Sequence, residues 1–320
     1  MSLPADYQVS TAAPTKRFAL WTNDVEDHSI WFNKLRYETG ELVLKEGMPI
    51  LLEIYRKFGI QSTFYFTGYM VEHFPDVVRM IIADGHEVAS HGYSHQVHEA
   101  FDVLSYNDQV THLEKSKKLL EDVCGYEVIS FRAPALRVNS DTPRALAQTG
   151  FKIDSSVASQ RFDMFLSFGS LKKLKWLTAP RLPYKTDPDN LFKKGNGPIT
   201  EIPLTALVFP YVGTTMRIFP VITKLQHVLL NAENNFHEKP IVFDVHPNEF
   251  INEESETRII ERRSKNFFSY LLADLVRGKL KVKNLGKAAI PLYEKEISYY
   301  RDRGYTFLTV RDYCKLKGFT

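Results

Sequence analysis

The stretch FALWTNDVEDH, residues 18–28, sets a pattern that later parts of the chain repeat. Residues 18–22 form a short, mainly apolar run, and they lead directly into Asp24, Glu26 and Asp27. An apolar run of this length, bounded by polar residues, is typical of a buried strand. The stretch therefore predicts a first strand that ends at Asp24 and carries carboxylates at its carboxyl end.

Short apolar strands and amphipathic helices alternate along the rest of the chain. Further strands are expected at residues 62–66, 87–90, 128–131, 151–154, 199–202, 240–245 and 306–310. Helices are expected at residues 42–58, with Pro49 interrupting, and at 76–83, 105–123, 142–150, 221–234, 254–277 and 292–303. Strands and helices that alternate with short connections indicate a parallel sheet, open or closed. We therefore expect an α/β fold, and 320 residues are enough for a (β/α) barrel.

The composition is that of an ordinary globular protein. With 16 Gly, 16 Pro and 13% aromatic residues, the chain is not collagen-like, coiled-coil or disordered. Periodicity is lost at residues 157–198, which are expected to form an elaborated loop inserted into the domain. We expect residues 1–17 to be an N-terminal extension, 18–320 to be a single domain, and 251–320 to be its helical C-terminal part.

Charge and apolar runs limit the classes of partner. The net charge of +3 is too small to indicate nucleic acid, and no run of 18 apolar residues predicts a transmembrane segment. Residues 1–17 lack a signal-peptide core, and two cysteines cannot form a disulfide framework, so a cytoplasmic location is expected. Lysines gather at residues 172–175 and 279–287. Such clusters indicate a solvated face or, alternatively, weak peripheral contact with anionic lipid.

Unusual polar residues follow several of the expected strands. In a parallel sheet the carboxyl ends share one edge, where ligands bind. His91 and His95, four residues apart, can reach one cation if the segment turns helically, and Asp24, Glu26 or Asp27 can supply a carboxylate. Two histidines and one carboxylate compose a hydrolytic zinc site. The alternative is a surface loop with incidental histidines.

Four other residues have both a structural and a catalytic interpretation. Asp24 is either part of an acidic turn or a general base beside the cation. His246, after an apolar strand, is either structural or a general acid that protonates a leaving amine. Arg132 is either a surface cation or a group that keeps a carboxylate ionised. Asp154 is either a cap for the next segment or a group that orients a histidine.

In this order the segments resemble the polysaccharide deacetylases with the NodB-homology domain, carbohydrate esterase family 4. The resemblance rests on TND at residues 22–24, QSTFYFTG at 61–68, GHEV at 85–88, SHGYSH at 90–95, FRAP at 131–134, DSS at 154–156 and VHP at 245–247. It implies a distorted (β/α) barrel related to the TIM barrel. It also implies removal of an N- or O-acetyl group from a carbohydrate or lipid-linked surface glycan by a metal-bound water. The divalent metal would be zinc, with cobalt or nickel as alternatives.

The resemblance also implies roles for individual residues. Asp24 would activate the water, with Arg132 orienting it. His246 would be the acid, with Asp154 as its partner.

The implied metal ligands are His91, His95 and one carboxylate. The commonest family pattern has two consecutive aspartates after the first strand, whereas here Val25 follows the first aspartate. The sequence is more similar to a subgroup with Asp-Val-Glu-Asp, in which we expect Glu26 to bind the metal. Asp27 is the alternative.

Three hypotheses follow for the function. The first is metal-dependent hydrolysis of an acetamido group on a sugar or lipid-linked glycan. The second is a deformylase or a hydrolase of a non-sugar amide or imide with the same fold. The third differs in class and is a catalytically inactive protein that binds a glycan or another partner.

Overall fold

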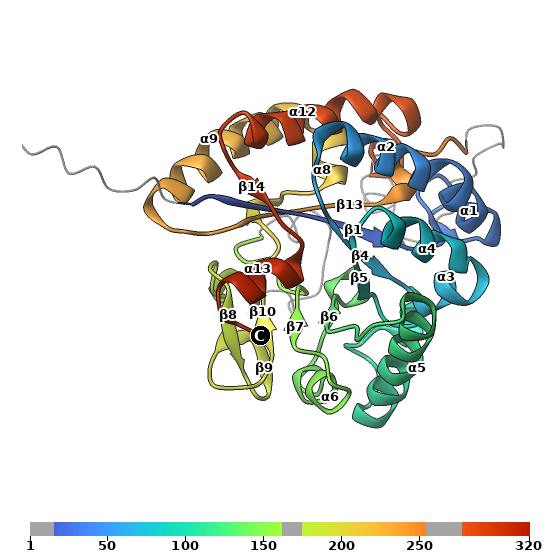
Figure 1. Ribbon diagram of the computed structural model, residues 1–320, viewed down its shortest axis with the longest axis vertical. Helices are drawn as coiled ribbons and strands as arrows, with labels where there is room; N and C mark the ends of the chain where they lie inside the picture. The colour runs from blue at the N-terminus through green and yellow to red at the C-terminus, as the bar shows by residue number, and fades with distance from the viewer. Residues whose placement is uncertain (1–15, 162–174, 254–276) are drawn as a thin grey trace, which may run out of the picture.

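The computed structural model describes residues 16–161, 175–253 and 277–320, and at its centre lies one curled sheet (Figure 1). Its strands are β1 (Phe18–Val25), β4 (Thr63–Phe66), β5 (Glu87–Ser90), β6 (Ser130–Phe131), β7 (Ile153–Asp154), β8 (Tyr184–Asp187), β9 (Asn190–Lys194), β10 (Thr200–Glu201), β13 (Ile241–Val245) and β14 (Thr306–Phe307). They lie in the order β13–β1–β4–β5–β6–β7–β10–β8–β9, with β14 also beside β1. The pairings from β13 to β10 are parallel, while β8 and β9 are antiparallel. The expected α/β barrel class is confirmed, in the form of a half-barrel.

Helices surround the sheet, and two small hairpins lie beside it. The α-helices are α1 (Tyr37–Leu42), α2 (Met48–Phe58), α3 (Gly68–His73), α4 (Pro75–Ala83), α5 (Tyr106–Cys124), α6 (Thr142–Gln148), α7 (Lys175–Thr178), α8 (Gly213–Ile218), α9 (Pro220–Phe236), α11 (Arg277–Lys281), α12 (Ile290–Arg301) and α13 (Val310–Leu316). The hairpins pair β2 (His28–Ser29) with β3 (Lys34–Leu35), and β11 (Ala206–Leu207) with β12 (Phe209–Pro210). Among the described residues, no helix is both long and apolar enough to cross a membrane.

The inside of the half-barrel changes from apolar to polar along the strands. Phe18 and Leu20 of β1 pack with Val242 of β13 in a buried cluster to which α13 contributes its own buried face. Because side chains alternate along a strand, Thr22 and Asp24 of β1 continue on the same face. The apolar part therefore fills the amino ends of the strands and leaves polar groups at their carboxyl ends.

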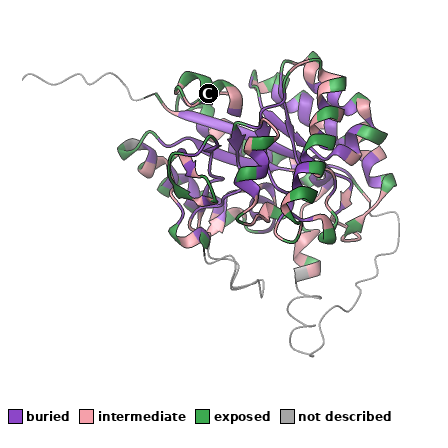
Figure 2. Cartoon of the chain, turned by 90° about the horizontal axis from the view of Figure 1, so that it is seen from below, coloured by how far each residue is buried: buried purple, intermediate pink, exposed green. Residues whose placement is uncertain are grey.

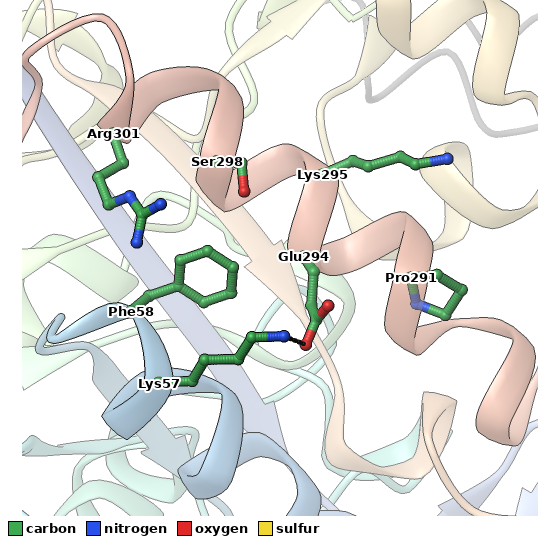
Figure 3. A pocket seen from close by; sticks show the side chains of 7 residues that line it. All are labelled: Lys57, Phe58, Pro291, Glu294, Lys295, Ser298 and Arg301. Atoms are coloured by element: carbon green, nitrogen blue, oxygen red, sulfur yellow. Dashed lines mark hydrogen bonds and ion pairs between the residues drawn. The ribbon is translucent and has the colours of Figure 1, made fainter.

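A second, larger apolar cluster fills the layer between the sheet and the outer helices. Figure 2 shows buried strands inside and helices that expose only their outward faces. Helix α12 packs on α2, where Lys57 bridges Glu294 at 2.7 Å and the Arg301 guanidinium lies 4.8 Å from the ring centroid of Phe58 (Figure 3). The hollow between these helices lies where α2 ends, before the start of β4. It is therefore at the amino ends of the strands, opposite the polar edge.

Most expected strands are confirmed, but Pro49 does not interrupt its helix. The helical stretch begins at Tyr37 and runs without a break to Phe58, and Pro49 stands in the first turn of α2. The preceding turn, Val43–Gly47, is π-helical. This wider turn accommodates the missing proline N–H, so the prediction of a break is wrong.

Residues 157–198 contain more regular structure than expected. Short helix α7 and the β8–β9 hairpin lie in this segment, and the hairpin extends the central sheet through β10. Tyr184 and Thr186 are buried while Lys185 and Asp187 are partly exposed, which is the period-two pattern of a strand with one buried face. The lysines and prolines concealed this pattern, and the prediction of a loop is wrong here.

The C-terminal part also differs from the expectation. The strand expected at 306–310 ends at Phe307, because the Thr309 hydroxyl accepts a hydrogen bond from the N–H of Asp312 and caps α13. The helix expected at 254–277 lies outside the described residues, except that α11 begins at Arg277. The helix expected at 292–303 is α12.

Candidate active site

The polar side chains at the carboxyl ends of the strands meet in one place. Asp24 lies in β1, His91 directly follows β5, Arg132 directly follows β6 and His246 directly follows β13. Since β13, β1, β4, β5 and β6 are neighbouring parallel strands, these positions share one edge. Sequence reasoning therefore placed them correctly at the edge.

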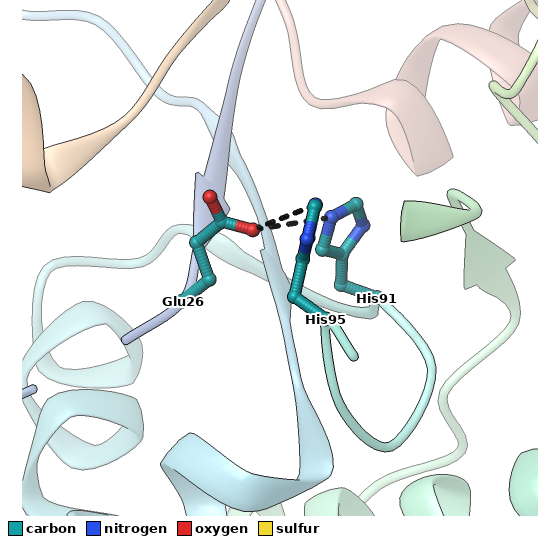
Figure 4. A group of neighbouring side chains, drawn as sticks. All are labelled: Glu26, His91 and His95. Carbon is teal, nitrogen blue, oxygen red and sulfur yellow. Dashed lines mark ion pairs between the residues drawn. The ribbon is translucent and has the colours of Figure 1, made fainter. Parts of the chain in front are cut away.

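Glu26, His91 and His95 form a compact group of possible metal ligands (Figure 4). Each offers one ligand atom, and these atoms all lie within 4.8 Å of one another. Glu26 Oε2 is 3.1 Å from Nε2 of His95 and 4.0 Å from Nε2 of His91. Two imidazole nitrogens and one carboxylate oxygen that converge in this way suit a divalent cation such as zinc.

The protonation of His91 is suited to metal binding. Its Nδ1 lies 2.9 Å from the backbone carbonyl oxygen of Arg132, which can only accept a hydrogen bond. Nδ1 therefore carries the proton, and Nε2 presents a lone pair towards Glu26. Burial lowers the pKa of His91, so that the ring stays neutral.

The surroundings of Glu26 are suited to metal binding, whereas those of Asp27 are not. Burial alone would raise the pKa of Glu26, but His95, His246, His28 and His91 lower it. Glu26 Oε2 is buried and accepts no hydrogen bond within the described part of the chain. A buried carboxylate oxygen without a donor, facing two imidazoles, fits a cation. Asp27 lies outside the ligand group, and burial and the charge of Glu26 raise its pKa to about 6.

Arg132 holds two carboxylates beside this group. Its Nη1 donates to Oδ1 of Asp24 at 2.8 Å and to Oδ1 of Asp244 at 2.6 Å, and its guanidinium lies 4.3 Å from the ring centroid of Tyr65. Burial opposes ionisation of Asp24, but Arg132, His91 and His246 together outweigh it and lower the pKa of Asp24 to about 2. Burial and the charge of Asp24 raise the pKa of Asp244. Asp24 is therefore the ionised member of the pair, and its Oδ2 lies 3.6 Å from Nε2 of His91.

His246 lies beside Asp24 and Asp244, with ligand atoms of the three within 4.8 Å of one another, and is held by Glu249. Nδ1 of His246 is 3.3 Å from Oε1 of Glu249, and its Nε2 is 4.0 Å from Oε1 of Glu26. Burial disfavours the charged imidazole, but Glu249, Asp244 and Glu26 raise the pKa of His246 to about 10. The ring is thus poised to donate a proton, although a cation at Glu26 would offset part of this rise.

The carboxylate of Glu249 is held in place by Arg217. Arg217 is fully buried and donates through Nε to Oε2 of Glu249, and its Nη1 donates to the carbonyl oxygens of Lys281 and Lys283 at 3.0 and 2.8 Å. Burial opposes ionisation of Glu249, but Arg217 lowers its pKa to about 2. A Cβ at Gly213 would lie 2.5 Å from Oε1 of Glu249, so the glycine lets the helix α8 backbone approach the carboxylate.

The structure does not pair Asp154 with His246. The Ser156 hydroxyl donates to Oδ1 of Asp154 at 2.6 Å, and the second neighbour of Asp154 is Glu201, paired with it across β7 and β10. Burial raises the pKa of both carboxyls. The carboxylate beside Nδ1 of His246 is Glu249, because the turn after β13 folds it back onto the ring. The expected Asp154–His246 contact is therefore corrected to Glu249–His246.

Sequence reasoning missed Asp244, Glu249 and Arg217. Asp244 precedes His246 by two residues, so the period of a strand could have placed both on one side. Glu249 is three residues after His246, the spacing of a capping box, which does occur here. No local signal identifies Arg217, because its contacts with residues 249, 281 and 283 depend on the tertiary fold.

Comparisons with known proteins agree with this geometry. Residues 24–153 match the model of the polysaccharide deacetylase family. A peptidoglycan deacetylase of Helicobacter pylori is 33% identical over 116 residues, which cover 36% of this chain and 39% of that protein. A peptidoglycan-N-acetylglucosamine deacetylase of Bacillus cereus is 26% identical over 141 residues, 41% of this chain and 49% of that protein. The matches thus span less than half of these curated relatives.

The fold is also found in solved structures. The crystal structure of a Mycobacterium smegmatis protein assigned to the polysaccharide deacetylases superposes with a TM-score of 0.54 at 21% identity. The superposition covers 97% of both chains. The half-barrel is therefore shared over almost the whole chain, and the family match covers residues 24–153.

Proposed function

We propose that this chain, with its match to the polysaccharide deacetylase family, is a metal-dependent hydrolase that removes an acetyl group from a glycan. The observation that carries the proposal is the convergence of the ligand atoms of Glu26, His91 and His95 next to two candidate proton-transfer groups, Asp24 and His246. Asp24 is paired with Arg132, His246 is held by Glu249, and atoms of Asp24, Asp244 and His246 lie within 4.8 Å of one another.

The residues of the site have three different roles in the proposed hydrolysis. A divalent cation at Glu26, His91 and His95 would supply Lewis acidity that polarises the acyl carbonyl and makes a water more acidic. Asp24 accepts the proton of the attacking water, since its low pKa keeps it ionised. His246 donates a proton to the leaving nitrogen, which departs as an amine while the acyl carbon becomes acetate.

Three finer points belong to the same proposal. The substrate class comes from the relatives, which deacetylate peptidoglycan and one of which carries N-acetylglucosamine in its name. A lipid-linked form of such a glycan is the narrower version. Zinc is the metal we favour, because the two nitrogens and one oxygen leave a position open for water and substrate.

Release of acetate from defined glycans tests the proposal. The metal-loaded wild type is incubated with N-acetylglucosamine oligomers and with peptidoglycan fragments, and acetate is measured together with the free amine. Release of both in equal amounts is expected, with loss of both in Asp24→Asn. Leu316→Ala, on the exposed side of α13 at the amino ends of the strands, is a control that should keep the activity.

The other hypotheses predict different products. Formate in place of acetate would identify a deformylase, and activity on cyclic amides without acetate would identify an amide or imide hydrolase. No product with a loaded metal site would favour a binding protein, and each of these results would contradict the proposal.

A further inference from the structure

Helix α9 (Pro220–Phe236) buries one face, and within the part of the chain that the structure describes its other face is exposed. The exposed face carries an apolar row that we call the α9 stripe: Val221, Leu225, Val228, Leu229, Ala232 and Phe236. Four of its members are largely exposed, Val221 by 77%, Leu225 by 60%, Val228 by 62% and Phe236 by 82%. The opposite face holds Gln226 and His227 against the protein, so the helix is fixed in this orientation.

The exposed apolar area is large for a monomer. At roughly 150–200 Å² for a fully exposed large apolar residue, the α9 stripe leaves on the order of 500–650 Å² uncovered. The largest apolar patch on a monomer is about 300–600 Å², and such patches mark interaction sites. A standard interface buries about 800 Å² per partner. The exposed Val208 and Phe219, in the adjoining hairpin and at the start of α9, extend the apolar surface towards that size.

The spacing of the stripe is that of helix–helix packing. Val221, Leu225, Val228 and Ala232 follow one another at intervals of four, three and four residues. This is the alternation of the core positions in a coiled coil, where the side chains of one helix fit between those of another. The α9 helix is already held in place by the domain, so a short seam does not have to form the helix.

We propose that the α9 stripe is the surface through which two copies of this chain associate, with their α9 helices antiparallel. A two-fold axis between Val228 and Leu229 pairs these two residues across the interface. The same axis places Leu225 opposite Ala232 of the second copy, and Val221 opposite Phe236 of the second copy. Each of these pairs joins a larger side chain to a smaller one, as close packing requires.

Charge favours a second copy over a lipid surface. Helices that lie on membranes carry many Lys and Arg beside their apolar face. In α9, Lys224 is the only lysine or arginine. The helix also lies on the outside of the half-barrel (Figure 1).

Light scattering after size exclusion, over a range of protein concentrations, tests the proposal. The wild type is expected at twice the 36.9 kDa of one chain, and Leu225→Glu and Val228→Glu at 36.9 kDa, with at least tenfold weaker association. Leu316→Glu is the matched control, because Leu316 is 56% exposed on α13 and should leave the dimer intact.

Cross-linking tests the register independently. In a Cys124→Ser background, Leu225→Cys with Ala232→Cys should give disulfide-linked dimers on oxidation, whereas Leu225→Cys alone should not. The two positions are about 10 Å apart along one helix, too far for a bridge within one chain. A wild type that stays monomeric at every concentration would overturn the proposal. So would dimers that survive Leu225→Glu, or a monomer that instead binds anionic vesicles through Leu225.

Discussion

Replacement of Glu249 by Gln tests the pairing that the structure assigns to the candidate acid. Gln keeps the size of the side chain and removes the charge that lies 3.3 Å from Nδ1 of His246. The account expects His246 to lose part of its preference for the protonated form. Asp154→Asn, at the position expected from the sequence, is the matched comparison because its carboxyl is equally buried.

The magnitude follows from the distance. Two unit charges 3.3 Å apart attract by about 5 kcal/mol at an effective dielectric constant of about 20, which is an upper limit. The His246 side chain is 27% exposed, so water reduces this value, and a fall in its pKa of roughly one to two units is expected. Loss of orientation should also lower kcat by roughly 10–100-fold, less than the roughly 10²–10⁴-fold contribution of a general acid.

The assay is the pH profile of kcat/KM for acetate release by the metal-loaded enzyme. An acid must be protonated to act, so activity falls as pH rises through the pKa of His246, which Glu249 and Asp244 raise and which a bound cation lowers in part. This fall of activity at high pH is the alkaline limb of the profile. In Glu249→Gln the alkaline limb should move to lower pH. In Asp154→Asn the limb should stay in place.

Arg217 complicates the experiment, because Glu249→Gln leaves its buried charge unpaired. Breaking a buried pair in this way costs about 3–5 kcal/mol of folding free energy. A double variant, Arg217→Met with Glu249→Gln, removes both charges and should recover much of the lost thermal stability while keeping the shifted limb. An unmoved limb in Glu249→Gln and in the double variant, or a shift in Asp154→Asn alone, would refute the pairing.

Four further substitutions have distinct expected outcomes. His91→Ala should abolish metal binding while His246→Ala keeps the metal and loses roughly 10²–10⁴-fold in rate, and equal metal loss in both would contradict this division. Arg132→Met should lower the free energy of unfolding by about 3–5 kcal/mol at neutral pH, since it leaves buried carboxylates without their cation, and an unchanged denaturant midpoint would argue against the network. Burial and Asp154 raise the pKa of Glu201 in the folded state, so the stability that protonated Glu201 contributes is present below its unfolded pKa and is lost as pH rises. Glu201→Gln should therefore raise the melting temperature more at pH 8 than at pH 5. The reverse order would contradict a raised pKa of Glu201.

The strands whose position depends on the local sequence pattern could be predicted from the sequence alone. The largely apolar runs at β1, β4 and β13 are buried on both faces, so the sequence pattern alone predicts them as strands. Likewise, Asp24, His91, Arg132 and His246 could be placed at one edge because parallel strands end together.

Other features depend on contacts between distant segments. Which carboxylate reaches His246 is decided by the turn after β13 and by Arg217, and not by the order of motifs along the chain. The β8–β9 hairpin was concealed because its strands carry Lys185, Lys193 and Lys194, which mask the alternation of buried and exposed residues. The choice between Glu26 and Asp27 needed the turn after β1, since both follow the strand directly.

The most direct test of the account is the metal content of the wild type, Glu26→Gln and Asp27→Asn after purification without chelators. About one divalent ion per chain is expected in the wild type and in Asp27→Asn, and a large loss is expected in Glu26→Gln. The two variants each remove one neighbouring buried carboxylate, so they control for each other. Metal retained in Glu26→Gln, or lost in Asp27→Asn alone, would contradict the ligand group on which the proposed chemistry rests.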